Sequence, residues 1–284
     1  MTASEKTRQA GVMGWPVSHS LSPRLHGYWL KKHGIDGTYV PLAVPPEEFE
    51  ATLGDLSGQG FVGVNVTVPH KEAAAVAVDS LEDTARRIGA VNTVVVAADG
   101  SLRGSSTDGF GFLENLKSGA PGWRASNGAA VILGAGGAAR AITAALMDAG
   151  VPELRLTNRT IRRAETLAAD IGGAINVVPW EDREEALEGA ALVVNATTLG
   201  MAGGEPLDLD LGALSTEAVI TDIVYTPLTT PLLEAGKGRG NPVVDGLGML
   251  LHQARPGFGQ WFGVEPAVDE ALRAFVLKGP EMPQ

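Results

Sequence analysis

The sequence predicts an α/β protein of two domains, each built on a parallel sheet covered by helices on both faces. Three observations lead to this prediction. Short runs of β-branched and apolar residues alternate with helical patterns along almost the whole chain. A glycine-rich loop at 134–140 directly follows one apolar run and opens a helical segment. The length of 284 residues suits one large or two medium domains.

Composition excludes several classes of protein. Apolar residues make up 44% and charged residues 19%, so the chain is able to bury a core. The 22 Lys and Arg face 33 Asp and Glu, and this net charge of −11 disfavours nucleic acid and anionic membranes as partners. The absence of cysteine excludes disulfides and thiolate nucleophiles. No apolar segment resembles a secretion signal or a membrane span, so we expect a cytoplasmic protein.

Elements of the first half follow from short apolar runs separated by turns. A polar tail at 1–9 precedes them. Ser22 and Pro23 suit the N-cap and first position of a helix at 22–33, in which Leu25 and Trp29 recur at helical spacing. A second helix with an acidic first turn is expected at 46–56. Strands are expected at 11–14, 38–44, 61–68 and 91–97.

The second half repeats the alternation, with a helix at 138–149 that ends at Gly150. The last stretch, 246–277, is mostly helical with a break near 263–266. The pattern is weakest at 117–128. We place the domain boundary near Asp108, because a helix that begins there would bridge the two domains. Strands are expected at 129–133, 153–157, 175–178, 191–195 and 219–224.

The glycine-rich loop matches the pattern G-x-G-x-x-A through Gly134, Gly136 and Ala139. In dinucleotide-binding folds the first glycine permits a tight turn, and the second lets the backbone approach a pyrophosphate. The small third residue lets the helix pack on the strand. The helix N-terminus offers N–H groups and a positive dipole end to phosphates. The loop therefore predicts a nicotinamide dinucleotide cofactor.

The residues after the next strand indicate which cofactor is used. An enzyme that prefers NAD usually has an acid there to accept from the ribose 2′-hydroxyl. This chain instead has Asn158, Arg159 and Thr160, followed by Arg163. The two arginines are four residues apart and would share one face of an opening helix. Guanidinium groups and a hydroxyl suit a 2′-phosphate, so NADP(H) is favoured over NAD(H).

Polar residues of the first half form a possible substrate site, although each also has an ordinary structural explanation. Ser22 would cap a helix, Lys71 is compatible with a solvated lysine, and Asp108 would cap the next helix. Asn92 lies in an apolar segment and needs buried hydrogen-bond partners. From the residues alone, the chain is an NADP-dependent enzyme with an unidentified polar substrate.

Several motifs in chain order resemble the shikimate dehydrogenase family, from about residue 14 to 263. In the first half they are Ser-His-Ser-Leu-Ser-Pro at 18–23, Asn-Val-Thr-Val-Pro-His-Lys at 65–71, Gly-Ala-Val-Asn-Thr at 89–93 and Thr-Asp-Gly at 107–109. In the second half they are Gly-Ala-Gly-Gly-Ala-Ala-Arg at 134–140, Asn-Arg-Thr-x-x-Arg at 158–163, Asn-Ala-Thr-Thr-Leu-Gly-Met at 195–201 and Gly-Leu-Gly-Met-Leu-Leu-His-Gln-Ala at 246–254.

The resemblance implies reversible reduction of 3-dehydroshikimate to shikimate by NADPH, in the pathway to chorismate and the aromatic amino acids. It implies that Lys71 is the general acid and base, paired with Asp108. The implied ligands of the substrate are Ser20, Ser22 and Tyr225 for the carboxylate and Thr67, Asn92, Asp108 and Gln253 for the ring hydroxyls. The implied cofactor residues are Gly134, Ala135, Gly136, Gly137, Ala138, Asn158, Arg159, Thr160, Arg163, Thr197, Gly246 and Met249.

The family's organisation implies a substrate-binding and catalytic domain of residues 1–108 plus 246–284. A Rossmann-like NADP-binding domain of residues 109–245 is inserted in it, with the active site in the cleft between the two. The expected partners are small molecules, and the chain is expected to be a monomer or homodimer. Three residues depart from common family choices, Trp15, Ser18 and Ser106, and we expect Ser106 to alter how Asp108 is held.

Other functions are weighed against this one. A quinate/shikimate dehydrogenase using NAD is disfavoured by Arg159 and Thr160, and Ser22 fits shikimate better than the Thr of some quinate enzymes. A non-catalytic NADP sensor would not need both Lys71 and Asp108. Methylenetetrahydrofolate dehydrogenase has a comparable two-domain plan but no clear use for the Ser-x-Ser segment. No metal is expected, because the five histidines show no close ligand pair with a carboxylate.

Overall fold

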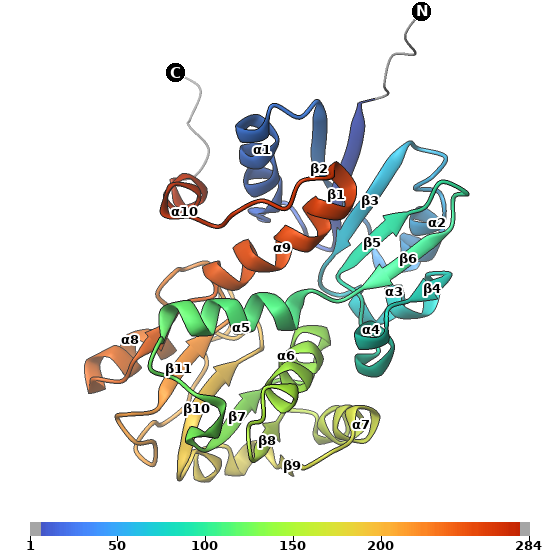
Figure 1. Ribbon diagram of the computed structural model, residues 1–284. Coiled ribbons are helices and arrows are strands. Elements are labelled where there is room, and N and C mark those ends of the chain that lie inside the picture. The colour runs from blue at the N-terminus through green and yellow to red at the C-terminus, as the bar shows by residue number, and fades with distance from the viewer. Residues whose placement is uncertain (1–6, 279–284) are drawn as a thin grey trace, which may run out of the picture. The chain divides into compact units, whose positions relative to one another are not determined.

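The computed structural model describes residues 7–278 and confirms an α/β protein with two sheets (Figure 1). The chain forms two units. Unit 1 contains the residues up to Thr107 and those from Gln253 onward, and unit 2 contains Asp108–His252. The chain enters unit 2 at the start of helix α5 (Asp108–Gly119) and leaves it within helix α9 (Leu247–Phe262).

Unit 1 has a six-stranded sheet with the order β2-β1-β3-β5-β6-β4. The first three strands in this order pair in parallel, whereas β5 runs antiparallel to both of its neighbours. The expectation of a wholly parallel sheet is therefore wrong for this unit. The strands are β1 (Arg8–Gly14), β2 (Gly37–Ala43), β3 (Phe61–Val66), β4 (Ser80–Leu81), β5 (Thr93–Val96) and β6 (Leu102–Ser105).

A tight turn explains why β5 and β6 are antiparallel. Ala97 N donates to Ser101 O at 2.8 Å, and Gly100 takes a φ of 86°, which favours glycine. A connection this short permits a hairpin but no parallel crossover. At the start of the chain, β1 already includes Arg8 and Gln9, so the expected tail is wrong for those two residues. Residues 1–6 of that tail lie outside the described residues.

Helices cover both faces of the unit 1 sheet. One face packs Met13, Val64 and Val94 against Phe49 and other apolar residues of the helices α2, α3 and α4. The opposite face receives α1 and the end of α9, whose Trp261 Nε1 donates to Val94 O at 3.0 Å. The helices are α1 (Ser22–His33), α2 (Phe49–Gly54), α3 (Lys71–Ala77), α4 (Asp83–Ile88) and α10 (Glu270–Leu277), with a 3-10 turn at Pro46–Glu48.

Unit 2 has a six-stranded sheet with the order β12-β11-β10-β7-β8-β9, and every pair is parallel, as expected. The chain order reverses between β7 and β10, which is the strand order of a Rossmann fold. Ligands of such folds bind beyond the carboxyl ends of the strands at this reversal. The strands are β7 (Ala129–Leu133), β8 (Leu154–Thr157), β9 (Ile175–Val178), β10 (Ala190–Asn195), β11 (Val219–Asp222) and β12 (Val243–Val244).

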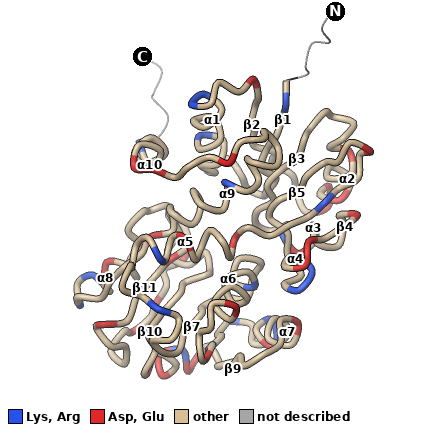
Figure 2. The backbone as a smooth tube through the Cα atoms, viewed as in Figure 1, with Lys and Arg blue, Asp and Glu red and all other residues tan. Residues whose placement is uncertain are grey.

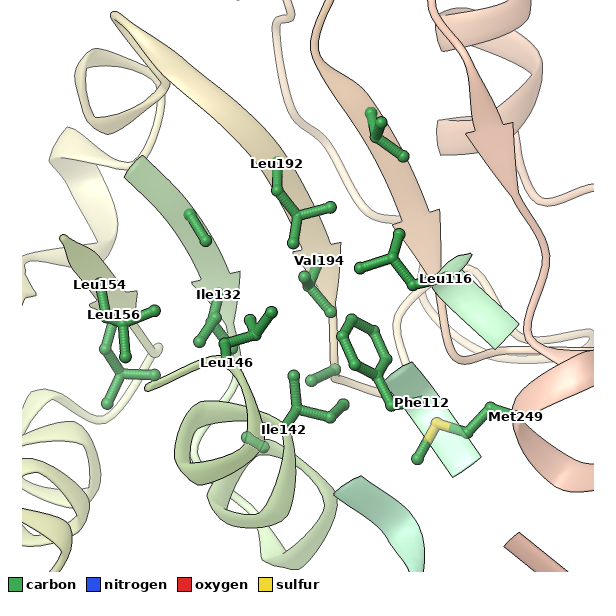
Figure 3. Close-up of a cluster of buried hydrophobic side chains, with 14 of the residues drawn as sticks. Phe112, Leu116, Ile132, Ile142, Leu146, Leu154, Leu156, Leu192, Val194 and Met249 are labelled. Carbon is green, nitrogen blue, oxygen red and sulfur yellow. The ribbon is translucent and has the colours of Figure 1, made fainter. Parts of the chain in front are cut away.

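Alternating side chains of these strands pack against helices on both faces. Figure 3 shows Ile132 and Val194 facing Ile142 of α6 and Phe112 of α5. The neighbouring Val131 points to the other face, which packs against α8. The helices of unit 2 are α5, α6 (Gly137–Asp148), α7 (Ile161–Ile171), α8 (Pro231–Arg239) and the start of α9, with 3-10 turns at Ala125–Asn127, Trp180–Asp182 and Glu185–Leu187.

Charged residues are concentrated on helices and loops rather than on the central strands (Figure 2). The strands β3, β7 and β10 contain no Lys, Arg, Asp or Glu. This distribution fits strands that are buried on both faces. Within residues 7–278, no helix has both the length and the apolar character that crossing a bilayer requires.

His26 of α1 is fully buried among aromatic side chains of unit 1. Its ring stacks on Tyr39, with centroids 3.8 Å apart and an interplanar angle of 2°, and meets Trp29 edge-on. Burial disfavours the imidazolium and lowers the pKa of His26 from 6.5 to about 3, although the nearby Asn65 acts in the opposite direction. The native protein therefore holds this imidazole in its neutral form at ordinary pH.

Replacing His26 by Phe is expected to reduce the acid sensitivity of folding. Below its ordinary pKa of 6.5 the unfolded chain protonates His26 while the native chain does not, so stability falls as the pH falls toward 3. Between pH 7 and 5 this difference amounts to about 2 kcal/mol. Urea denaturation of wild type, His26→Phe and the exposed control His33→Phe should show a flatter pH dependence for His26→Phe alone. An unchanged slope in that variant would contradict the prediction.

Candidate active site

The polar loops that follow β1 and β3 lie against each other at one edge of the unit 1 sheet. Trp15 N donates to Val68 O at 3.0 Å, and Thr67 N donates to Met13 O at 2.9 Å. A Cβ added to Gly14 would lie 2.5 Å from Thr67 Cγ2, so a larger residue would force the loops apart. Because β1 and β3 pair in parallel, the segments that follow them, with Ser20 and Ser22 in one and Lys71 in the other, lie at the same end of the sheet.

The local contacts of Ser22 differ from the expected helix cap, and Ser20 takes part in them. Helix α1 begins at Ser22, and Leu21 is its N-cap residue, so the prediction that Ser22 caps the helix is wrong. The reason is that Leu21 already has near-helical angles (φ −82°, ψ −5°). Ser20 Oγ instead accepts from Ser22 N at 3.2 Å. Ser22 is buried.

A buried chain of hydrogen bonds extends from Tyr39 across the sheet. The Tyr39 hydroxyl of β2 donates to Asn65 Oδ1 of β3 at 2.6 Å. Asn65 Nδ2 in turn donates to Asn92 O at 3.1 Å and to Thr93 Oγ1 at 3.2 Å. Burial raises the pKa of Tyr39 well above its ordinary value, so the phenol keeps its proton. Asn65 therefore joins Tyr39 of β2 to Asn92.

Asn92 and Gln253, both expected to hold ring hydroxyls, are brought together by this network. Asn92 Nδ2 donates to Gln253 Oε1 of α9 at 3.0 Å. Asn92 Oδ1 accepts from Thr107 N at 2.8 Å, and the Thr107 hydroxyl donates to Gln253 O at 2.8 Å. The sequence signalled that buried Asn92 needs partners, but it did not identify Tyr39 or Thr107 among the connecting residues.

Lys71 is the first residue of α3, and Thr67 lies in the turn before it. The backbone at Lys71 is held because Lys71 O accepts from Val91 N at 2.9 Å. The preceding His70 is buried, its Nε2 is hydrogen-bonded to Val44 O at 2.7 Å, and its ring stacks on Phe49. The lysine side chain thus extends from a fixed backbone position and is itself partly exposed.

Asp108 and Tyr225 belong to unit 2, whereas the other expected substrate residues belong to unit 1. Asp108 is buried at the first position of α5. Tyr225 lies three residues beyond the end of β11 and is partly exposed.

The glycine loop of unit 2 has the local features that its motif predicts. Gly134 has a φ of 114°, and a Cβ there would lie 3.0 Å from Ala196 O. Gly136 is the N-cap residue of α6 with no side-chain cap, and a Cβ there would meet open space. Ala139 is fully buried between helix and sheet. Ala135 completes the loop, while Gly137 and Ala138 form the first turn of α6.

The segment after β8 presents Arg159 in the turn before α7, because the helix begins only at Ile161. The expectation that Arg159 and Arg163 share a helix face is therefore wrong, and only Arg163 is in the first turn. Asn158 Nδ2 donates to the carbonyl oxygen of Thr160, the N-cap residue of α7, at 2.9 Å. Arg159 Nη1 donates to Glu205 Oε2 at 2.8 Å, and sequence reasoning did not identify this acidic partner.

A second buried polar cluster positions Thr197 at the end of β10. Asn195 Oδ1 accepts from Thr197 Oγ1 at 2.7 Å, while Asn195 Nδ2 donates to Asp222 Oδ1 at 3.0 Å. Asp222 also accepts from Thr230 Oγ1 at 2.7 Å. Burial raises the pKa of Asp222, although its hydrogen bonds act in the opposite direction. The cluster ties the end of β10 to the end of β11.

Gly246 and Met249 lie around the start of α9. A Cβ on Gly246 would lie 2.3 Å from Ile223 O, so close backbone packing by itself accounts for a glycine there. Met249 is 6% exposed and packs in the apolar cluster beside Phe112 (Figure 3). Their contacts with a cofactor stay a prediction, as do those of the other expected site residues.

Comparison with known proteins identifies the family. A family model described as the shikimate dehydrogenase substrate binding domain matches residues 12–94, and one described as shikimate / quinate 5-dehydrogenase matches residues 120–201. The chain is 62% identical to the shikimate dehydrogenase (NADP(+)) of Paramagnetospirillum magneticum, over 96% of this chain and 99% of the relative. This chain belongs to the shikimate dehydrogenase family. The Rhodospirillum rubrum shikimate dehydrogenase (NADP(+)) is 59% identical over 97% and 99% of the two chains.

Solved structures of the shikimate dehydrogenase family share the fold. The shikimate 5-dehydrogenase of Thermus thermophilus, in complex with NADP(H) and shikimate, is 39% identical with a TM-score of 0.84, over 96% of this chain and 99% of that one. A quinate dehydrogenase from Corynebacterium glutamicum, in complex with NAD, is 30% identical with a TM-score of 0.87 over the same shares. The fold is therefore common to enzymes named for different substrates and crystallised with different cofactors.

Replacing Tyr39 by Phe is expected to destabilise the protein by about 1–3 kcal/mol, because the buried Asn65 Oδ1 loses its donor. Tyr28→Phe is a matched control on α1, where the partly exposed ring packs against Phe275. Urea denaturation of the two variants checks the difference. Equal stabilities of the two variants would show that the Tyr39 hydroxyl contributes no such interaction.

Proposed function

We propose that this chain catalyses the reversible NADPH-dependent reduction of 3-dehydroshikimate to shikimate, a step toward chorismate and the aromatic amino acids. The observation that carries the proposal is 62% identity to an enzyme named for this activity, over 96% of the chain. The folding of the motif residues supports it. Polar groups suited to a hydroxylated acid gather in unit 1, and unit 2 has the strand order of a dinucleotide-binding fold.

The residues of unit 2 fit NADP(H). The N-terminus of α6 has no side-chain cap, and the open space over Gly136 leaves room for a pyrophosphate against free N–H groups. In our proposal, Gly134–Ala138 hold the pyrophosphate, and Asn158, Arg159, Thr160 and Arg163 hold the adenosine 2′-phosphate. Arginine suits this role because its planar fork matches phosphate oxygens. Thr197, Gly246 and Met249 complete the proposed binding residues.

The residues of unit 1 suit a carboxylate attached to a polyhydroxylated ring. Ser20 and Ser22, with Tyr225, supply hydroxyl donors for the carboxylate. Asn92, Gln253, Thr67 and Asp108 supply donors and acceptors for the ring hydroxyls. Burial of Asn92 and Gln253 within a hydrogen-bonded network limits their rotation, which favours recognition of one arrangement of hydroxyls.

Lys71 and Asp108 perform the proton transfer in this proposal. NADPH, when bound, supplies the hydride to the ketone carbon. As that carbon is reduced, its oxygen gains negative charge, and the Lys71 ammonium stabilises the charge and donates a proton to the oxygen. In the oxidative direction the Lys71 amine removes the proton from the same hydroxyl. Asp108 orients Lys71 and accepts a hydrogen bond from the substrate.

Initial rates with two acids and two cofactors test the proposed reaction. We expect oxidation of shikimate with NADP to be the fastest of the four combinations of shikimate or quinate with NADP or NAD. The expected preference for NADP rests on the two arginines that follow β8, where an enzyme that prefers NAD usually has an acid. A higher kcat/KM for quinate with NAD would favour the function of the Corynebacterium relative instead.

Replacing Lys71 by Ala is expected to lower kcat by roughly 10²–10⁴-fold while changing KM for shikimate much less, since general acid–base catalysis contributes about this factor. Steady-state kinetics of Lys71→Ala are compared with those of Lys31→Ala, an exposed lysine near the end of α1. A raised KM with near-normal kcat in Lys71→Ala would assign this lysine to binding rather than to proton transfer.

A further inference from the structure

The guanidinium proposed to bind the 2′-phosphate already has an anionic partner in this chain. Arg159 Nη1 donates to Glu205 Oε2 at 2.8 Å, and the two side chains are 64% and 72% exposed. The residues are 46 positions apart in sequence, in the turn before α7 and in the loop after β10. A carboxylate and a phosphate ester bind a guanidinium through the same kind of charge-assisted hydrogen bond.

The loop after β10 presents Glu205 from a defined position. Gly200 N donates to Glu205 O at 2.8 Å, which closes the loop at its base. Ala202 N donates to Thr226 O at 2.8 Å and ties the loop to the segment after β11. Leu207, two residues beyond Glu205, is buried against the core of unit 2. The carboxylate is therefore directed toward Arg159 by the fold of the loop.

We propose that Glu205 weakens the preference for NADP(H) by competing with the 2′-phosphate for Arg159. This inference rests on the proposed use of NADP(H). A 2′-phosphate that binds Arg159 displaces the carboxylate, which then remains nearby and repels the phosphate. Glu205 thus weakens the binding of NADP(H), whereas an adenosine without a 2′-phosphate leaves the ion pair intact. Glu205 therefore makes the difference in affinity between NADP(H) and NAD(H) smaller than Arg159 alone would give.

Exposure of the pair favours competition over a role of Glu205 in orienting Arg159. A single contact joins one guanidinium nitrogen to one carboxylate oxygen, and both side chains are largely solvated. Exposed ion pairs of this kind contribute little to stability and exchange readily with other ions. A partner that fixed Arg159 for the phosphate would need a buried or bidentate contact to hold its orientation.

Equilibrium binding of 2′,5′-ADP and 5′-AMP to the full chain tests the proposal without turnover. The two probes differ by the 2′-phosphate. We expect Glu205→Gln to bind 2′,5′-ADP roughly two- to fivefold more tightly than wild type, with 5′-AMP unchanged, from the usual strength of an exposed ion pair. The gain should shrink at high salt, because salt screens exposed charges. In a chain that already carries Arg159→Gln, adding Glu205→Gln should give no further gain in 2′,5′-ADP binding.

Asp208→Asn is the matched control. Asp208 is an exposed acid three residues further along the loop, and its backbone oxygen, not its carboxylate, accepts from Arg183 at 3.2 Å. An equal gain in 2′,5′-ADP binding by Asp208→Asn would show that removing any negative charge from the loop is enough. That result would overturn the proposal. Unchanged or weaker binding of 2′,5′-ADP to Glu205→Gln would also overturn it.

The failure of this inference is distinguishable from the failure of the proposed function. A wild-type chain that binds 2′,5′-ADP more tightly than 5′-AMP supports NADP(H) as the cofactor, whatever Glu205→Gln does. A wild-type chain without that preference, and without oxidation of shikimate by NADP, would overturn the proposed function and the role of Glu205 together.

Discussion

The geometry of unit 1 depends on the hydrogen bonds of the buried Asn65 amide. It accepts from Tyr39 of β2 and donates to the backbone of Asn92 and to Thr93 of β5. It therefore links β3 to the neighbouring β5 and to β2, which lies beyond β1. Leaving such a buried group without partners costs about 1–3 kcal/mol, so the linked segments hold one another in place. Gln253 is attached to the Asn92 end of this network. Asn92 and Gln253, which are proposed to bind the ring hydroxyls, are thereby placed by one set of hydrogen bonds.

Unit 2 uses the same physical arrangement at the carboxyl ends of β10 and β11. Asn195 binds Thr197 with its oxygen and Asp222 with its nitrogen. The close approach of Gly134 to the backbone of Ala196 places the glycine loop beside this cluster. In both units, buried polar side chains at strand ends organise the loops that carry the proposed function, while apolar side chains of the same strands form the cores.

The excess of acidic residues in the chain is relevant to the ion pair at Arg159. A net charge of −11 means that carboxylates outnumber cations, so a cation on the surface readily finds an acidic neighbour. Lys32 pairs with Asp269 at 2.8 Å and Arg159 with Glu205 at 2.8 Å. In the proposed site, an anionic cofactor therefore competes with Glu205 for Arg159. The excess of carboxylates in the chain would in this way affect the preference of one site for NADP(H).

The sequence by itself determined the features that depend on neighbouring residues. The strand at 129–133 and the roles of Gly134 and Ala139 were predicted correctly, because a tight turn and close helix packing leave few residue types possible. The pairing of β5 with β3 and the hydrogen bond from Tyr39 to Asn65 were decided by tertiary structure. So was the pairing of Glu205 with Arg159. These features join residues far apart in the chain, such as Tyr39 with Asn65, and no local periodicity records which distant partner satisfies a buried or charged group.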